Sequence, residues 1–243
     1  MISGADPSAL HQSMTRLPIL GPDRCEAIRT RIYELKEHWR KRSEAVPFFT
    51  LGTASYLDAR SSSDAYKFQN QSDSPLLMHH FEDLYKQVGA TLQEHLGQSV
   101  THRHEQAPPG FHIYLAHPFF EKPVADVHFD RQYSWLNWPN QHEIDLSTHL
   151  SFTLPISIPR LGAGLHVWDI ESSSFTTKSR EQQKVIFREA CKVYEPYEIG
   201  TLFLHSGDLL HQIAPGTRLS QDDERITLQG HALRRRNTWL LYW

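Results

Sequence analysis

The chain has 243 residues, a net charge of −3 and an ordinary share of hydrophobic (39%) and charged (22%) residues. This balance is typical of a soluble folded chain with its own core, and it gives no reason to expect a nucleic acid or a membrane surface as partner. Two cysteines without a pairing motif favour a reducing compartment, and neither a signal peptide nor a long apolar run is evident. We therefore expect a cytoplasmic enzyme or binding protein.

The first helix is predicted to open at Gly21-Pro22-Asp23, because Ile28, Ile32, Leu35 and Trp39 recur at helical spacing. We expect it to end near 42–43 and to be followed by an extended segment over 46–57. Each apolar position lies on one face, so this helix should cover a sheet rather than stand alone.

A second helix is predicted to begin at Ser74, an N-cap followed by Pro75 at the first helical position. Gly97 ends it as a C-cap. Residues 58–73 are rich in Ser, Asp and Asn, which predicts a loop before this helix.

From about residue 99 the sequence changes to short extended runs separated by Pro and Gly, which predicts a sandwich, jelly roll or barrel. Ser179 and Gln182 form a capping box for a helix over 179–191, which we interpret as an insertion between strands. The expected fold is mainly β with flanking helices (α+β), a single domain over 1–243, with 1–98 as support and 99–243 as core. The candidate strands are 111–116, 124–130, 148–158, 163–170, 198–205, 209–214, 224–233 and 237–242.

The motif His128-Phe129-Asp130 is the first candidate for chemistry. In a strand, residues two apart point to the same face, so an imidazole and a carboxylate would lie side by side. These are two of the three ligands in a 2-His-1-carboxylate facial triad, which holds Fe(II) and leaves open positions. Such a motif is common by chance, so the third ligand has to be found elsewhere.

Downstream, a strand, a Ser-Gly-Asp turn and a second strand present two histidines, His205 and His211. His211 follows the tight turn and is the preferred third ligand, while His205 competes for the same role. Arg225 and Thr227 then share one face of a later strand. A buried Arg beside a hydroxyl can bind a carboxylate through three hydrogen bonds.

The ordered set His128-x-Asp130, His211 and Arg225-x-Thr227 resembles the Fe(II)/2-oxoglutarate-dependent dioxygenases, whose core is a double-stranded β-helix (jelly roll). The resemblance covers roughly 111–233, with N-terminal helices as the buttress of the larger sheet. It implies that His128, Asp130 and His211 bind Fe(II), and that Arg225 and Thr227 hold 2-oxoglutarate, which reacts with O₂ to give succinate and CO₂. A further co-substrate contact is open among Tyr114, His112 and Thr148.

The substrate is less well defined. Candidate contacts are Arg131, Trp135, His166 and Trp168, and for each of them a surface ion pair or core packing is an alternative. Tyr133 and Trp138 line the cavity or pack their own loop. By family analogy we expect the protein to hydroxylate or otherwise oxidise a small molecule, such as an amino acid derivative or a natural-product intermediate. We expect the protein to be a monomer or a homodimer.

Two other classes remain open. A cupin-type metal enzyme would use more histidines and no 2-oxoglutarate, which would leave Arg225 and Thr227 without a role. A non-enzymatic jelly-roll binding protein would have no need of a complete ligand set.

Overall fold

The structure is a computed structural model that describes residue 10 and residues 13–60, 62–138 and 140–243. In chain order the elements are β1 (Thr15–Pro18), α2 (Pro22–Glu34), η1 (Lys36–His38), β2 (Arg40–Lys41), β3 (Phe48–Leu51), η2 (Ser55–Ala59), α3 (Ser63–His80), α4 (Glu82–Leu96), β4 (Ser99–His102), β5 (Gly110–Leu115), η3 (Pro118–Glu121), η4 (Gln132–Trp135), η5 (Gln141–Glu143), β6 (Ile144–Ser157), β7 (Leu165–Glu171), α5 (Ser172–Phe175), α6 (Arg180–Glu189), β8 (Lys192–Glu195), β9 (Thr201–Ser206), β10 (Leu209–Ile213), β11 (Glu224–Arg235) and β12 (Thr238–Tyr242).

The larger sheet has the strand order β1-β9-β6-β11-β5-β3-β2, with β12 pairing to both β11 and β4. Successive side chains along its strands point to opposite faces of the sheet, as in any β-sheet. On β11, Ile226 and Leu228 join the main hydrophobic core, whereas Arg225 and Thr227 point to the opposite, inner face. The inner face of this sheet is therefore polar.

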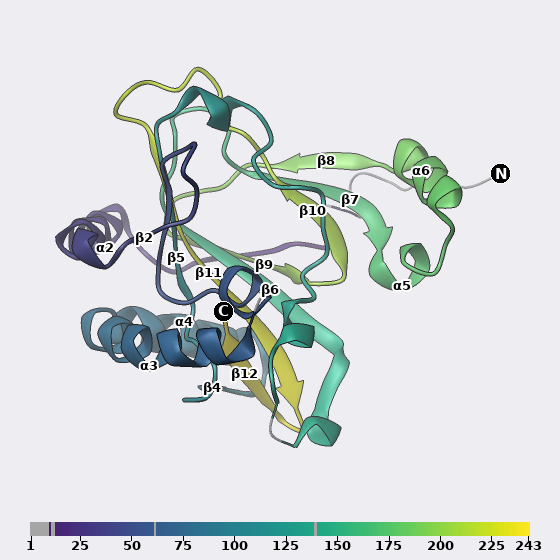
Figure 1. The fold of residues 1–243 in the computed structure, drawn as a ribbon, viewed down its shortest axis with the longest axis horizontal. Helices are drawn as coiled ribbons and strands as arrows, with labels where there is room; N and C mark the ends of the chain where they lie inside the picture. Colours follow the sequence, from purple (N-terminus) through teal and green to yellow (C-terminus); the bar gives the residue numbers. More distant parts are fainter. Residues whose placement is uncertain (1–9, 11–12, 61, 139) are drawn as a thin grey trace.

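The helices α2, α3 and α4 cover the outer face of the larger sheet (Figure 1). Ile32 of α2 and Val88 of α4 have no exposed surface and pack into the same core as the outward residues of β5, β6, β9 and β11. This confirms the mainly β core with flanking helices. Among the described helices, none has both the length and the apolar character needed to cross a membrane.

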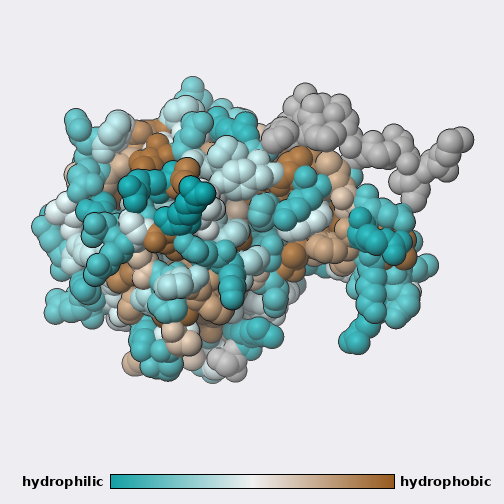
Figure 2. Space-filling view, turned by 90° about the horizontal axis from the view of Figure 1, so that it is seen from above, coloured by the Kyte–Doolittle hydropathy of each residue, from teal (hydrophilic) through white to brown (hydrophobic). Residues whose placement is uncertain are grey.

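A smaller sheet, with the order β10-β7-β8, lies across from the inner face of the larger one (Figure 1). The insertion α5–α6 follows β7, and α6 begins with the predicted capping box between Ser179 and Gln182. Seen from above, hydrophobic residues are visible in several places between the hydrophilic ones (Figure 2). The two sheets enclose the cavity that the candidate site occupies.

Several predicted boundaries are wrong in the N-terminal part. The first helix ends at Glu34 rather than near 42–43, because the chain turns through η1 into β2. The expected loop over 58–73 is mostly helix: α3 begins after Ser62, whose side chain accepts a hydrogen bond from Ala65 N. Pro75 therefore lies inside α3 and Ser74 is not an N-cap, although Gly97 does end α4 with φ 65°. Helical burial of Tyr66 and Leu77 outweighs a loop-like composition.

The later strands are close to their predicted ranges, with one exception that affects the site. Residues 124–130 do not form a regular strand; they are irregular except for an isolated bridge between His128 and His211. The short strands β1, β2, β4 and β8 were not predicted. The apolar run 239–243 completes the sheet, because β12 pairs with β11 and with β4.

Candidate active site

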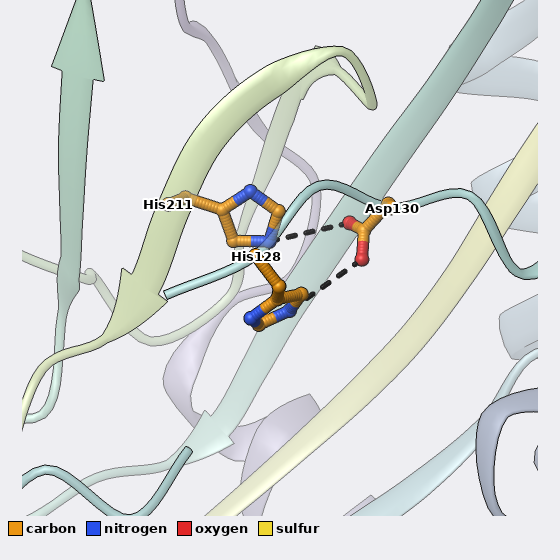
Figure 3. Close-up of side chains that lie close together, drawn as sticks. All are labelled: His128, Asp130 and His211. Carbon is orange, nitrogen blue, oxygen red and sulfur yellow. Dashed lines mark ion pairs between the residues drawn. The ribbon is translucent and has the colours of Figure 1, made fainter. Parts of the chain in front are cut away.

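Three side chains meet in the wall of the cavity. His128 and Asp130 come from the irregular segment and His211 from β10, and their nearest ligand atoms all lie within 4.8 Å of one another (Figure 3). Nε2 of His211 lies 3.3 Å from Asp130 Oδ2, and Nε2 of His128 lies 3.6 Å from Asp130 Oδ1. Among the described residues this is the group of His, Cys, Asp and Glu side chains that could hold a metal ion.

Backbone hydrogen bonds fix the irregular segment in the absence of a strand. His128 and His211 exchange N–H···O=C bonds of 2.9 and 3.0 Å, and Asp130 N donates to Gly207 O at 2.9 Å. Gly207 has no room for a side chain, since a Cβ there would lie 2.1 Å from Cδ2 of His149. The turn between β9 and β10 therefore holds Asp130, and the strand that follows this turn carries His211 and its bridge to His128.

The hydrogen bonds of the two imidazoles also define which nitrogen faces the metal position. Nδ1 of His128 lies 2.7 Å from Asp126 O, and Nδ1 of His211 lies 2.9 Å from Leu209 O. A carbonyl oxygen only accepts, so each Nδ1 carries the proton and donates it. Each Nε2 therefore faces the Asp130 carboxylate, and in the neutral imidazole it is this nitrogen that offers the lone pair a metal ligand requires.

The electrostatics keep the carboxylate charged. Burial alone would raise the pKa of Asp130, but the imidazoles of His211, His231 and His128 outweigh it and hold this pKa well below its usual range. Burial lowers the pKa of His128, with a further lowering from His211. For His211 the attraction of Asp130 outweighs burial and raises the pKa. An ionised Asp130 beside imidazole nitrogens is a donor set suited to Fe(II).

Two further histidines surround this group. The ring of His205 lies 4.8 Å from that of His211, and Nδ1 of His231 lies 4.0 Å from Asp130 Oδ2. Burial lowers the pKa of each to about 4, so both are neutral at neutral pH. His205 was the alternative ligand considered from the sequence; His231 was not singled out, and only its alternation with Arg225 and Thr227 on β11 could have indicated its position.

A second polar site lies on the inner face of β11. Arg225 is buried, and its Nε and Nη2 have no hydrogen-bond partner among the described residues; its Nη1 lies 3.5 Å from Ala214 O. The guanidinium carbon lies 5.3 Å from the Tyr197 ring centre. Thr227 has no exposed surface, and its hydroxyl also has no partner. A buried cation with unused donors is costly, so an anionic ligand such as a carboxylate fits this site.

The neighbouring strand supplies candidates for a further co-substrate contact. Tyr114 and His112 on β5 pair in register with Arg225 and Thr227 and line the cavity. His112 Nε2 lies 2.6 Å from the hydroxyl of Tyr56, a residue that the sequence did not single out. Thr148, the third candidate from the sequence, is not among the residues that line the cavity.

The cavity has a volume of about 500 Å³ and contains the three metal-ligand candidates in its wall. Arg131 and Trp135 also line it, and Trp135 is 41% exposed. Tyr133 and Trp138 pack into a buried cluster instead. The structure does not bring His166 and Trp168 to the cavity: they lie on the other face of β7, where Trp168 stacks on Phe187 of α6 and His166 contacts Tyr194.

Known structures share this fold. The chain superimposes on a non-heme alpha-ketoglutarate-dependent epimerase, SnoN from nogalamycin biosynthesis, with a TM-score of 0.51 and 12% identity over 95% of this chain and 87% of that one. An N-substituted L-amino acid dioxygenase from Burkholderia ambifaria gives 0.54 and 15% over 98% and 91%. The carbocyclase SnoK gives 0.50 and 13% over 93% and 81%.

No protein-family model and no curated protein matches the sequence. At such low identity the likeness establishes the fold alone, which is the jelly-roll fold expected from the sequence.

Proposed function

We propose that the protein is a non-haem Fe(II)- and 2-oxoglutarate-dependent oxygenase that hydroxylates or otherwise oxidises a small molecule. One observation carries this proposal: next to the cavity with the His-Asp-His group lies the buried guanidinium of Arg225, which has no acidic partner among the described residues. Arg225 lines an adjoining pocket, and Tyr114 lines both this pocket and the cavity. The solved structures with the same fold support it, since one of them is described as a complex with alpha-ketoglutarate.

Each residue has a distinct role in this proposal. His128, Asp130 and His211 would hold iron from one side, with Asp130 supplying the negative charge. Arg225 and Thr227 would bind the distal carboxylate of 2-oxoglutarate, and their unused donors match its acceptors. When bound, iron and 2-oxoglutarate would supply the oxidising chemistry with O₂, while this chain orients the ligands and limits access of water.

The polar inner wall completes the pocket. Tyr114 stands opposite Arg225 in the β5–β11 pairing, so its ring would lie beside the bound co-substrate. Tyr197 stacks over the guanidinium and restricts its orientation. The Tyr197 ring therefore helps to fix the direction in which Arg225 presents its donors.

The test is an anaerobic titration of metal-free protein with Fe(II) and 2-oxoglutarate, followed by the weak visible charge-transfer band of the chelate. We expect the band in the native protein, its loss in His211→Ala, and in Arg225→Ala a band that needs at least about 100-fold more 2-oxoglutarate, as for loss of a charged hydrogen-bonded pair.

Two matched variants control for unspecific effects. His166→Ala removes a histidine outside the cavity, and Arg188→Ala removes an exposed arginine on α6. Both should leave the titration unchanged. Absence of the band in folded native protein, or an unchanged 2-oxoglutarate titration in Arg225→Ala, would contradict the proposal.

A cupin-type metal site without 2-oxoglutarate is the second candidate, because His205 and His231 surround the same carboxylate. In that case His205→Ala would release the metal as readily as His211→Ala does. Under the main proposal, His205→Ala keeps the metal and changes only the environment of the cavity.

A further inference from the structure

We infer that the substrate is a small organic anion with an aromatic or otherwise flat apolar body, bound by a wall that η2 and η4 form together. This inference rests on the proposed function for the reaction but not for the binding. We call the residues concerned the η2–η4 wall; they are Tyr56, Leu57, Arg60, Arg131, Ser134 and Trp135.

The η2–η4 wall is a single surface although its two parts are far apart in sequence. The elements η2 and η4 are in contact, and all six residues line the same cavity. Arg60, Arg131 and Trp135 are exposed, so they lie on the side of the cavity that is open to solvent. A ligand that enters toward His128 therefore passes these side chains.

The η2 turn is held in place before any ligand arrives. It is one turn of π-helix, a rare conformation that is frequent at functional sites. Its Asp58 is buried and accepts two hydrogen bonds of 2.7 Å from Arg42 and one of 2.9 Å from Ala54 N. Arg40 reaches both Asp58 and Asp73, at 3.3 and 3.0 Å. The wall therefore presents Arg60 from a rigid base.

The charge of the wall is uncompensated. Arg60 and Arg131 make no ion pair with any described acid, whereas Arg40 and Arg42 nearby are fully engaged. The acids that line the cavity are Asp130, which belongs to the metal group, and Asp126, which precedes it on the ligand segment. Two free guanidinium groups on one wall favour a carboxylate, sulfate or phosphate on the substrate.

The same wall offers a flat apolar surface. Within the wall, Trp135 is 41% exposed and Tyr56 adds a second ring, and Phe48 of the neighbouring strand β3 lines the same cavity. An exposed indole is unfavourable in water and gains contact area when a ring stacks on it. The volume of about 500 Å³ lies in the range of cavities that hold drug-sized ligands. Together these features match an aromatic or polycyclic anion.

The experiment uses three probes with the same naphthalene ring, similar size and different charge: 2-naphthoate, its planar isostere 2-naphthamide, and 2-naphthylmethylammonium. Their binding is followed by fluorescence anisotropy, on metal-free protein and on protein saturated with Fe(II) and 2-oxoglutarate without O₂. We expect naphthoate to bind about tenfold more tightly than the amide, and the ammonium probe to bind most weakly. The preference for naphthoate should decrease with added salt, since exposed charges are screened.

Variants assign the charge recognition to the wall. Arg131→Gln and Arg60→Gln should each weaken naphthoate about fivefold, as for a partly exposed ion pair, and leave the amide unchanged. Trp135→Ala should weaken both probes equally. Arg180→Gln, at the start of α6 and outside the cavity lining, is the matched control.

Three outcomes would overturn the inference: equal binding of carboxylate and amide, preference for the ammonium probe (which would assign recognition to Asp126), or displacement of naphthoate by 2-oxoglutarate. The proposed function is tested separately by the charge-transfer band. A band without a preference for naphthoate rejects the substrate class alone, and the reverse result rejects the cofactor chemistry alone.

Discussion

The two walls of the cavity hold their functional residues in different ways. On the larger sheet, His231 in the cavity wall and Arg225 and Thr227 next to it lie on one face of β11. This strand is paired on both sides, with a register shift against β6 between Ile226 and Thr227. Across the cavity, His128 and Asp130 lie on a segment without a strand, held by the bridge to His211 and by the bond to Gly207. The first wall gets its geometry from the sheet, and the second gets it from a few contacts with β10 and with the turn before it.

This difference predicts which substitutions should disturb the candidate site most. A change on β11 removes one donor and leaves the strand in place, because its backbone bonds do not depend on that side chain. A change beneath the ligand segment moves two ligands at once. The predictions below test this contrast, from the largest expected effect to the smallest.

Lowering the pH should have the largest effect on stability, through the buried histidines of the larger sheet. Burial lowers the pKa of His112 to about 3 and those of His205 and His231 to about 4, whereas an unfolded histidine titrates near ~6.5. Between these values the unfolded chain binds more protons, so stability falls as the pH falls. We expect the free energy of unfolding of metal-free protein to drop by several kcal/mol, on the order of the summed pKa shifts, between pH 6.5 and 4.

Denaturant titrations at four pH values measure this drop. His205→Gln should make the dependence shallower, and the exposed His95→Gln should not. The pKa of His211 is raised in the folded protein, so its contribution to the free energy of unfolding is lost only as the pH rises above the ordinary histidine pKa. A stability that does not change over this range would contradict the neutral, buried state of the three histidines.

Gly207→Ala should weaken metal binding about 10- to 100-fold, as loss of outer-shell support does. The added Cβ would meet the ring of His149, so the turn must shift and the bond from Asp130 N is strained. Calorimetric titration with Fe(II) under anaerobic conditions gives the affinity. Gly89→Ala in α4, where nothing lies within 4 Å of the new Cβ, is the matched control and should bind metal normally.

Thr227→Val should weaken 2-oxoglutarate about tenfold, the effect of one lost hydrogen bond, and leave the metal affinity unchanged. The hydroxyl has no partner in the described structure, so its removal should not lower the stability of the metal-free protein. The visible band at increasing 2-oxoglutarate and a thermal melt measure the two effects. A loss of stability equal to the loss of affinity would show that the hydroxyl has a structural role instead.

Phe175→Ala should have the smallest effect, a two- to threefold loss of metal affinity. Phe129 lies between the two ligands, and its ring centre is 5.9 Å from that of Phe175 in α5. This contact supports the ligand segment from the side of the insertion. Val185→Ala on the exposed part of α6 should leave the affinity unchanged. An equal loss in both variants would attribute the effect to the α5–α6 insertion as a whole and not to the contact between Phe175 and Phe129.

Sequence reasoning works best where a residue's role follows from its neighbours in the chain. Alternation along β11 correctly predicts that Arg225 and Thr227 share a face, and the turn before His211 predicts that it lies at a strand start. The spatial meeting of His128, Asp130 and His211 agrees with the expected ligand group. The identification of these residues as iron ligands stays a prediction.

Other features depend on contacts that no local pattern contains. His166 and Trp168 alternate correctly with Leu165 and Val167, but both faces of β7 are covered, so the sequence could not decide which face meets the cavity. The first part of α3 is helical although its composition predicts a loop, because Tyr66 and Leu77 are buried against segments distant in the sequence. In the sequence Gly207 is an ordinary turn glycine, and only the structure shows that His149 leaves no room for a side chain at this position.

The bridge between His128 and His211 also has a consequence for the order of events during folding. It joins residues far apart in the chain, and β10 must already be paired with β7 for His211 to be in position. Contacts of such long range form late and slowly. Under the proposed function, the complete ligand group would form only after the two sheets have come together, so iron loading would follow folding and would not start it.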